Sequence, residues 1–501
     1  MTIPRPDDTI PARSNVGRQT VSGAVKMFLA QGLMVPTGLA TVAFLTRALG
    51  PDGYGVYGLA VTLVMTIEWT IAHALSRATI RLVGSSTDWK PVATRVLQIY
   101  LVVSLAVAIG LWLSAPALAG FLDEPRLISP LRLLTIDVPL LVMGFGHQVI
   151  LTGRGRFGQR ALAISARWVA RVALIVLFVS LGLSINGAIL GTIGASLVEL
   201  IVAMRYDRPA LFRRVQAPVR ALYVYALPLF LLSLGLRFIQ QVDLIAFKAL
   251  GGTTAMAGVF AGARSLALMA ALFSMAFSPL LLSTLSRLVG AGDLEHARDM
   301  GRDALRFPFL LLPLIGIAVG ASIEITVFAL GIEFEAAAPL LEQLVVAGVA
   351  MTLFGVCSSI LTAAGKPHWP FALIGPLAPI TVVGHLVAVP RWGALGAVTV
   401  TASVSIVAAV LGVFAVGRLW HVWPPPSSIL RGVAVALATY VAARWWATTG
   451  WLIVIKLTLI SIAIPVVLWV SGEFDARERR LLRAVLLRPW EDGPGSTFEA
   501  Q

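Results

Sequence analysis

The most constraining feature of this chain is a succession of long apolar segments between residues 20 and 472. A membrane-crossing helix needs about 20 predominantly apolar residues, and we count 14 segments that meet this requirement. They are residues 20–47, 54–83, 92–114, 128–152, 157–182, 186–205, 219–249, 255–287, 303–330, 337–364, 369–389, 393–418, 428–447 and 451–472. Open strands cannot cross lipid, and the alternation typical of a membrane barrel is absent, so these segments predict helices.

The composition agrees with a chain that uses lipid as its solvent. Hydrophobic residues make up 58% of the sequence and charged residues 13%, whereas a soluble domain carries about 25% charged residues. This balance excludes an ordinary water-soluble enzyme, and it excludes a disordered chain, which has low hydrophobicity. The single cysteine, Cys357, excludes a disulfide framework and a site with several thiolate ligands. We therefore predict an all-α integral membrane protein with no metal and no cofactor.

The positive charges divide unevenly between the two sides of the membrane. When the 14 segments alternate in direction, one set of connectors and the two chain ends together hold 28 Lys and Arg residues. The opposite side holds six, namely Arg47, Arg126, Arg132, Lys248, Arg391 and Arg444. Cytoplasmic connectors carry an excess of Lys and Arg, so the bias predicts that both termini are cytoplasmic. The net charge of +14 then reflects topology, and we expect no nucleic-acid partner.

The two ends of the chain differ in character. Residues 1–19 are polar and lack the apolar core of a secretory signal, which predicts a cytoplasmic N-terminal segment. Residues 473–501 form a second cytoplasmic segment and tail. Within it, Asp475–Arg488 separates Arg and Leu onto different helix faces, which is typical of a helix that lies on a lipid surface. Membrane lipids are therefore expected partners.

The two halves of the chain resemble each other at an offset of about 201 to 210 residues. The matched pairs are Leu49-Gly50 with Leu250-Gly251, Gly55–Ala60 with Gly258–Ala263, Leu151–Arg156 with Leu361–Lys366, and Gly187-Ala188 with Gly393-Ala394. Each copy contains six spans, an even number, so the copies share one orientation. We predict two six-helix lobes, residues 20–215 and 216–420, related by a pseudo-two-fold axis along the membrane normal. Residues 421–472 are then two additional transmembrane helices.

The stretch Thr46–Ala60 (TRALGPDGYGVYGLA) resembles the junction between the first two spans of polysaccharide and O-antigen flippases. This family belongs to the multidrug/oligosaccharidyl-lipid/polysaccharide exporter superfamily. The resemblance covers the first 12 spans and implies a V-shaped pair of lobes around a central cationic cavity. It also implies that the protein moves an oligosaccharide carried on polyprenyl diphosphate from the inner to the outer leaflet of a bacterial inner membrane. We accordingly expect a monomer that works beside polysaccharide polymerase machinery.

Polar and charged side chains interrupt several apolar segments. The candidate substrate-binding residues are His73, Arg77, Arg167, Arg171, Arg237, Gln240, Gln241 and Arg264. An arginine at the centre of a membrane helix costs about 2.5–3.5 kcal/mol. Two acids at comparable depth, Glu68 and Asp243, can neutralise two of the five arginines. The remaining positive charge calls for an anion, and arginine binds phosphate through a planar fork of donors.

Each of these residues also has a structural interpretation. Arg77 and Arg167 lie toward the cytoplasmic side, where an arginine can extend to water. Arg237 can pair with Asp243 or Glu68, and Glu68 can serve either as a coupling acid or as a salt-bridge partner. No acid accompanies Arg264 on its own segment. We predict that Pro36 is a hinge in the first span, because proline removes a helical hydrogen bond.

The sequence contains no pattern that supports chemistry. Gly153–Gly158 matches a dinucleotide-binding pattern in form, but it follows a membrane helix instead of a strand. We therefore predict that the protein is not an enzyme. Three functions remain open: a lipid-linked oligosaccharide flippase, a cation-coupled multidrug exporter of the same superfamily, and a non-transporting scaffold in polysaccharide assembly. A drug exporter would need an acidic site.

Overall fold

The computed structural model describes residues 26–27, 29–86, 88–207, 209, 211 and 241–473. All regular structure in these residues is helical, which confirms the predicted all-α class. The helices are α2 (Met34–Ala74), α3 (Ser76–Ser85), α4 (Lys90–Phe121), η1 (Pro125–Leu127), α5 (Ile128–Leu134), α6 (Asp137–Gly153), α7 (Phe157–Phe178), η2 (Val179–Leu183), α8 (Ser184–Tyr206), α10 (Thr254–Gly290), α11 (Leu294–Leu310), α12 (Leu312–Gly320), α13 (Ser322–Leu330), η3 (Ile332–Ala337), α14 (Ala338–Ala363), α15 (His368–Ile374), α16 (Leu377–Trp420), α17 (Pro426–Trp445) and α18 (Leu452–Val470). The predicted cytoplasmic end segments, 1–19 and 473–501, lie outside the described residues except for Glu473.

Nine helices in the described ranges are long and apolar enough to cross a membrane. Three of them span 45, 50 and 53 residues, and each of these contains a glycine with positive φ. Within α16, a Cβ atom placed on Gly384 would come 2.8 Å from Val400. These residues would lie about 24 Å apart in one straight helix, so α16 folds back on itself at Gly393 (φ 57°). A Cβ on Gly191 would likewise come 2.6 Å from Ile175, because α7 and α8 form a hairpin.

The predicted connector between the first two spans is a single sharp bend. Residues 29–73 are helical on both sides of Gly50, whose φ of 64° and ψ of 178° redirect the chain just before Pro51. A second, milder break occurs at Leu33, three residues before Pro36. Pro36 therefore lies in the first turn of α2, where a proline interferes little with helical hydrogen bonding. Its role as a hinge stays a prediction.

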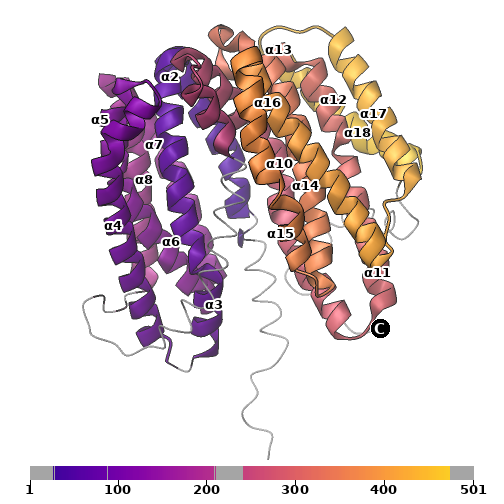
Figure 1. Ribbon diagram of the computed structural model, residues 1–501, viewed down its shortest axis with the longest axis horizontal. Coiled ribbons are helices and arrows are strands. Elements are labelled where there is room, and N and C mark those ends of the chain that lie inside the picture. Colours follow the sequence, from indigo (N-terminus) through magenta and orange to yellow (C-terminus); the bar gives the residue numbers. More distant parts are fainter. Residues whose placement is uncertain are drawn as a thin grey trace, which may run out of the picture.

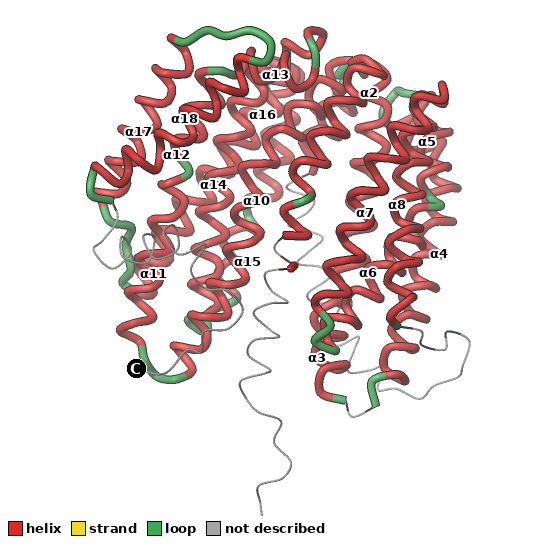
Figure 2. Tube along the Cα trace, turned by 180° about the vertical axis from the view of Figure 1, so that it is seen from behind, coloured by secondary structure: helices red, strands yellow, loops and turns green. Residues whose placement is uncertain are grey.

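The helices form two groups that lie side by side (Figure 1). Elements up to α8 make one group and α10 to α16 the other, while α17 and α18 cover the outer edge of the second group. Both views show the groups close together at the end where α13 terminates and further apart toward α3 and α11 (Figures 1 and 2). Of these two outer helices, α18 is joined to α13 by a buried ion pair, in which Lys456 contacts Glu324 at 2.7 Å.

Two of the repeated segments have the same backbone geometry. Gly155 and Gly365 end α6 and α14 with φ values of 69° and 77°. The amide of Arg156 donates to the carbonyl of Leu151 at 2.8 Å, and the amide of Lys366 donates to that of Leu361 at 2.9 Å. Both are helix terminations that favour glycine, since a side chain would be strained at this φ. The similarity at an offset of 210 residues therefore extends from the sequence to the hydrogen-bond pattern.

Candidate functional site

The two groups of helices meet where α2 packs against α10. A Cβ atom on Gly55 would collide with the carbonyl oxygen of Thr254, and one on Gly258 would collide with that of Pro51. The two contacts are equivalent, because Pro51 and Gly55 correspond to Thr254 and Gly258 at the same offset of 203 residues. Between them, a Cβ on Gly58 would lie 2.9 Å from Ala261. Reciprocal contacts of this kind are the signature of an isologous, two-fold interface.

Hydrogen bonds also join the two groups of helices at the same end of the molecule. The guanidinium of Arg47 donates to the carbonyl oxygen of Ala329 at 2.8 Å and also to that of Phe328. The hydroxyl of Thr254 donates to the carboxylate of Glu124, which joins the connector after α4 to the start of α10. The two groups of helices are thus held together by both backbone packing and hydrogen bonds at this end.

Glu124 contributes electrostatically to this contact between the two groups of helices. Its carboxylate lies 2.7 Å from Arg126, which also contacts Asp52 at 2.5 Å. The hydrogen bond from Arg126 outweighs the opposing effect of burial, and the hydrogen bond from Thr254 acts in the same direction. Together they lower the pKa of Glu124 to about 2. Glu124 is therefore charged at every physiological pH, and the contact persists there.

A network of buried charges lies in the first group of helices. Arg167 of α7 lies 3.1 Å from Glu199 of α8, and the carboxylate of Glu199 also accepts a hydrogen bond from Gln148 of α6. Glu68 and Asp137 are 1% and 2% exposed, and each has a carboxylate oxygen without a hydrogen-bond partner. Besides Glu124 and Asp207, which are buried at the helix ends, three carboxylates are therefore enclosed within this group, and of these three only Glu199 is in a short ion pair.

Arg171 lies one turn beyond Arg167 and faces the seam between α2 and α10. Its guanidinium is 3.5 Å from the hydroxyl of Tyr57 on α2, and its Nε has no hydrogen-bond partner. Tyr57 is next to Gly58 of the reciprocal contact. No carboxylate of the described ranges lies within 4.0 Å of Arg171, although Asp137 is close enough to interact with it electrostatically. Arg171 is therefore a cation at the seam without a direct acidic partner.

Arg264 has an acidic partner outside its own helix. Its guanidinium lies 3.0 Å from the carboxylate of Asp243 and 2.6 Å from the side-chain oxygen of Gln241. Asp243 therefore pairs with Arg264, whereas the structural interpretation from the sequence was that Arg237 can pair with Asp243 or Glu68. The predicted excess of about three unpaired arginines is also too large, because Glu199 and Asp137 add two buried acids that were not counted.

Among the remaining candidates, a break in the helix separates His73 from Arg77. His73 ends α2, where its ring stacks on Trp69 at 4.7 Å and contacts Phe145 at 4.6 Å. Arg77 belongs to α3, beyond a turn at Leu75, so His73 and Arg77 lie on two consecutive helices. Arg237 and Gln240 lie outside the described residues.

Sequence reasoning missed Asp137, Glu199 and Tyr57. A signal for the acids was available, because each is a carboxylate within an apolar segment, 128–152 or 186–205. Acids at membrane depth are rare and functional unless paired. Tyr57 had no such signal, since an aromatic residue in an apolar segment is ordinary.

Comparison with known proteins assigns the family. The model of a family described as polysaccharide biosynthesis protein matches residues 21–284, and the chain belongs to this family. A putative O-antigen transporter of Shigella flexneri is 29% identical over 190 residues. That match covers 35% of this chain and 45% of the transporter, so the chain spans about half the length of this curated relative.

Solved structures place the fold among membrane transporters. The lipid II flippase MurJ, in an inward closed conformation, has a TM-score of 0.72 at 15% identity and covers 93% of this chain and 100% of its own. An inward-facing multidrug transporter of the MATE family has a TM-score of 0.61 at 17% identity, covering 83% of this chain and 98% of its own. At these identities the likeness concerns the fold alone. The protein is an all-α, multi-pass membrane protein that shares its fold with this superfamily.

Proposed function

We propose that this protein is a flippase that moves a lipid-linked oligosaccharide, carried on polyprenyl diphosphate, from the inner to the outer leaflet of a bacterial inner membrane. Family membership, the likeness to an O-antigen transporter and the fold shared with a lipid II flippase support this function. The product would serve the synthesis of a cell-surface polysaccharide. Polysaccharide polymerase machinery is the proposed partner of a monomeric flippase.

Arg171 is the observation that carries the proposal. It is a guanidinium beside the seam of the two helix groups, it touches Tyr57, and it has no carboxylate within 4.0 Å among the residues described. A diphosphate that entered between the groups could bind to this fork of donors. Arg167 and Arg264 are proposed to bind the same anion after exchanging their present acidic partners, together with His73, Arg77, Arg237, Gln240 and Gln241.

The proposed mechanism is alternating access of two six-helix lobes, residues 20–215 and 216–420. The full chain would have 14 spans with both termini in the cytoplasm. The reciprocal contact of Gly55 and Gly258 with opposing carbonyls supports a two-fold relation of the lobes, and its separation would open the outer side. Pro36 is proposed to let the first span bend, and Glu68 to take up a coupling ion or to form a salt bridge during the cycle.

The test is a transport assay with the full chain in proteoliposomes. The substrate is a fluorescent oligosaccharide on polyprenyl diphosphate, and transfer to the outer leaflet is read by accessibility to an added glycosidase. We expect Arg171→Gln to reduce the initial rate at least about tenfold, the cost of one lost charged hydrogen bond. Arg444→Gln is the matched control, because Arg444 is exposed in the last turn of α17. Equal rates for the two variants would contradict the proposed site.

A cation-coupled exporter of small drugs is the second candidate. It is favoured by the enclosure of Glu68, Asp137 and Glu199 in one group of helices, since an acidic site suits a cationic substrate. Proteoliposomes that extrude a cationic dye but do not transfer the oligosaccharide would establish this function. A chain that transports neither, in cells that still require it for surface polysaccharide, would be a scaffold.

A further inference from the structure

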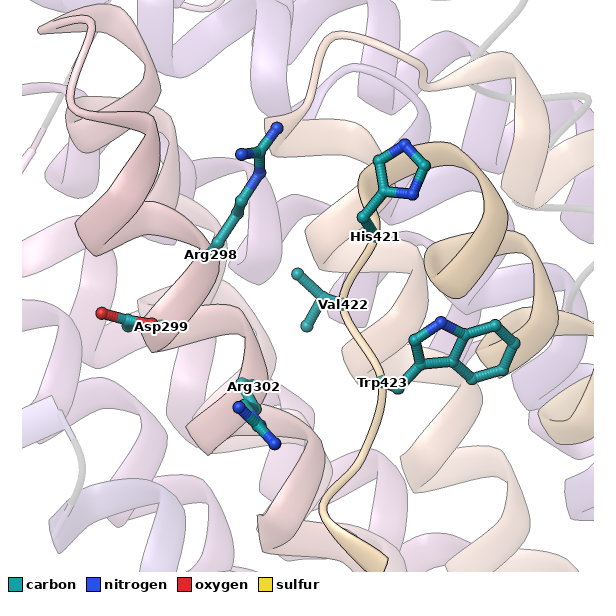
Figure 3. Close-up of a pocket in the computed structure, with 6 residues that line it drawn as sticks. All are labelled: Arg298, Asp299, Arg302, His421, Val422 and Trp423. Carbon is teal, nitrogen blue, oxygen red and sulfur yellow. The ribbon is translucent and has the colours of Figure 1, made fainter.

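A cavity of about 250 Å³ lies between α11 and the connector that joins α16 to α17. Figure 3 shows its lining: Arg298, Asp299 and Arg302 from α11, and His421, Val422 and Trp423 from the connector. The two arginines are one helical turn apart, and both lie on the side of α11 that borders the connector (Figure 3). Asp299 stands at the edge, with its carboxylate directed away from the connector.

The cavity lies at the level of a membrane surface. The connector, residues 421–425, links two membrane-spanning helices and therefore turns back at the surface where both end. On the proposed topology this surface is cytoplasmic. Trp423 is 49% exposed, and tryptophan is enriched at the height of lipid headgroups. A ligand of this cavity would therefore lie among headgroups, remote from the seam of α2 and α10.

The two arginines lack an acidic partner among the residues that the structure describes. Among the described residues, no carboxylate oxygen lies within 4.0 Å of Arg298 or Arg302, whereas Arg306, one turn further on, contacts both Asp303 at 3.6 Å and Glu473 at 3.3 Å. Acids thus lie within reach of Arg306, and of the described arginines of α11 the two beside the cavity have none within 4.0 Å. With Asp299 as the one acid of the lining, the cavity carries one excess positive charge when His421 is neutral.

The connector is fixed in place by its own packing. Val422 is 4% exposed and belongs to the buried cluster with Ile360 and Trp420. The ring of Trp423 lies so close to Gly417 that any side chain there would collide with it. His421 adopts a left-handed conformation with φ 58°, which is uncommon for a residue other than glycine. The connector that faces the arginines is therefore held in one conformation by packing.

We propose that this cavity binds the phosphodiester headgroup of an acidic membrane phospholipid. The two guanidiniums would hold the phosphate oxygens, His421 would donate to the headgroup, and Trp423 would lie beside the glycerol. A single negative charge matches the excess charge of the lining. The volume is below the range of about 300–1,000 Å³ that accommodates drug-sized ligands, and it suits a headgroup. Basic pockets between helices at the cytoplasmic surface bind anionic lipids in this manner.

The test is native mass spectrometry of the full chain, with phosphatidylglycerol and phosphatidylcholine as probes. We expect the wild type to retain phosphatidylglycerol in preference to phosphatidylcholine. The double variant Arg298→Gln/Arg302→Gln should bind phosphatidylglycerol about 10- to 30-fold more weakly, from about 1 kcal/mol for each lost cation. The control Arg205→Gln/Arg287→Gln removes the same charge from exposed positions outside the cavity. If the double variant does not assemble, each single arginine variant is compared with its single control.

Three results would overturn the proposal. One is an equal loss of phosphatidylglycerol in the cavity variant and the control, which would indicate a general charge effect. Another is equal retention of the two lipids by the wild type. The third is displacement of bound phosphatidylglycerol from the wild type by millimolar inorganic phosphate, with no such effect of phosphate on the cavity variant. This result would make the ligand a soluble phosphate. Because the readout is lipid retention, its outcome does not depend on whether the oligosaccharide is transported.

Discussion

The two halves of the chain share backbone geometry and differ in what they bury. Both contain glycines with positive φ at matched positions, such as Gly155 and Gly365, and both contribute equally to the reciprocal contact between α2 and α10. Yet the first half encloses Glu68, Asp137 and Glu199. Of the residues described between 241 and 420, Asp243 is the one enclosed carboxylate, and it is paired with Arg264. The repeated sequence features therefore correspond to shared backbone geometry, and the set of buried acids is what the two halves do not share.

The difference in buried charge gives the largest expected effect. Replacing Arg264 with Met leaves Asp243 buried without its cation, at a cost of about 3–5 kcal/mol. Replacing Arg167 with Met costs less, about 1–3 kcal/mol, because Glu199 keeps its hydrogen bond from Gln148 and the nearby charge of Arg160. Thermal unfolding of the purified variants measures both. If Arg167→Met lowers the stability more than Arg264→Met does, the remaining partners of Glu199 do not compensate for the loss of Arg167.

Removing both charges of the pair tests the cause of the lost stability. The double variant Arg264→Met/Asp243→Leu removes both charges and should recover most of the stability lost in Arg264→Met alone. Recovery would show that the loss came from the uncompensated carboxylate. A double variant as unstable as the single one would show that the packing of Arg264 matters more than its charge.

The reciprocal contact gives the next effect. Gly55→Ala and Gly258→Ala each force the α2 and α10 backbones apart, which costs the closed arrangement about 1–3 kcal/mol and shifts its population about 5- to 150-fold. The two variants should behave alike, because they occupy equivalent positions. Gly110→Ala is the control, since no atom lies within 4 Å of a Cβ at that helical position. Distances between spin labels across the outer end measure the opening, and unequal shifts for the two variants would exclude a two-fold contact.

Glu68 gives a smaller effect on stability and a distinct effect on transport. Because no cation of the described ranges lies within 4.0 Å of it, Glu68→Gln should change the free energy of unfolding by less than about 1 kcal/mol. If Glu68 takes part in coupling, the same variant loses the pH dependence of transport in proteoliposomes. Asp137→Asn serves for comparison. A large loss of stability in Glu68→Gln would instead assign it to a salt bridge.

The last effect concerns Glu124 and depends on pH. Its pKa of about 2 in the folded protein lies below the ordinary value of 4.5, so its contacts stabilise the folded state above pH 4.5 and lose that effect as pH falls toward 2. The melting temperature of the wild type should exceed that of Glu124→Gln at pH 7, and the difference should narrow below pH 4.5. A difference that stays constant down to pH 3 would show that the charge of Glu124 contributes nothing.

The sequence by itself determined the class of this protein and many of its backbone features. Apolar segments of about 20 residues leave helices as the structure that satisfies the backbone within lipid. The predicted span boundaries also fall beside Gly50, Gly155 and Gly393, where the structure has the positive φ that a side chain disfavours. The arrangement of charges was decided by the tertiary structure. The partner of Arg264 lies 21 positions away on another helix, and Glu199 meets Arg167 across a hairpin. Periodicity along one helix reports which residues share its face, but it carries no information about the rotation of the neighbouring helix that supplies the opposite charge.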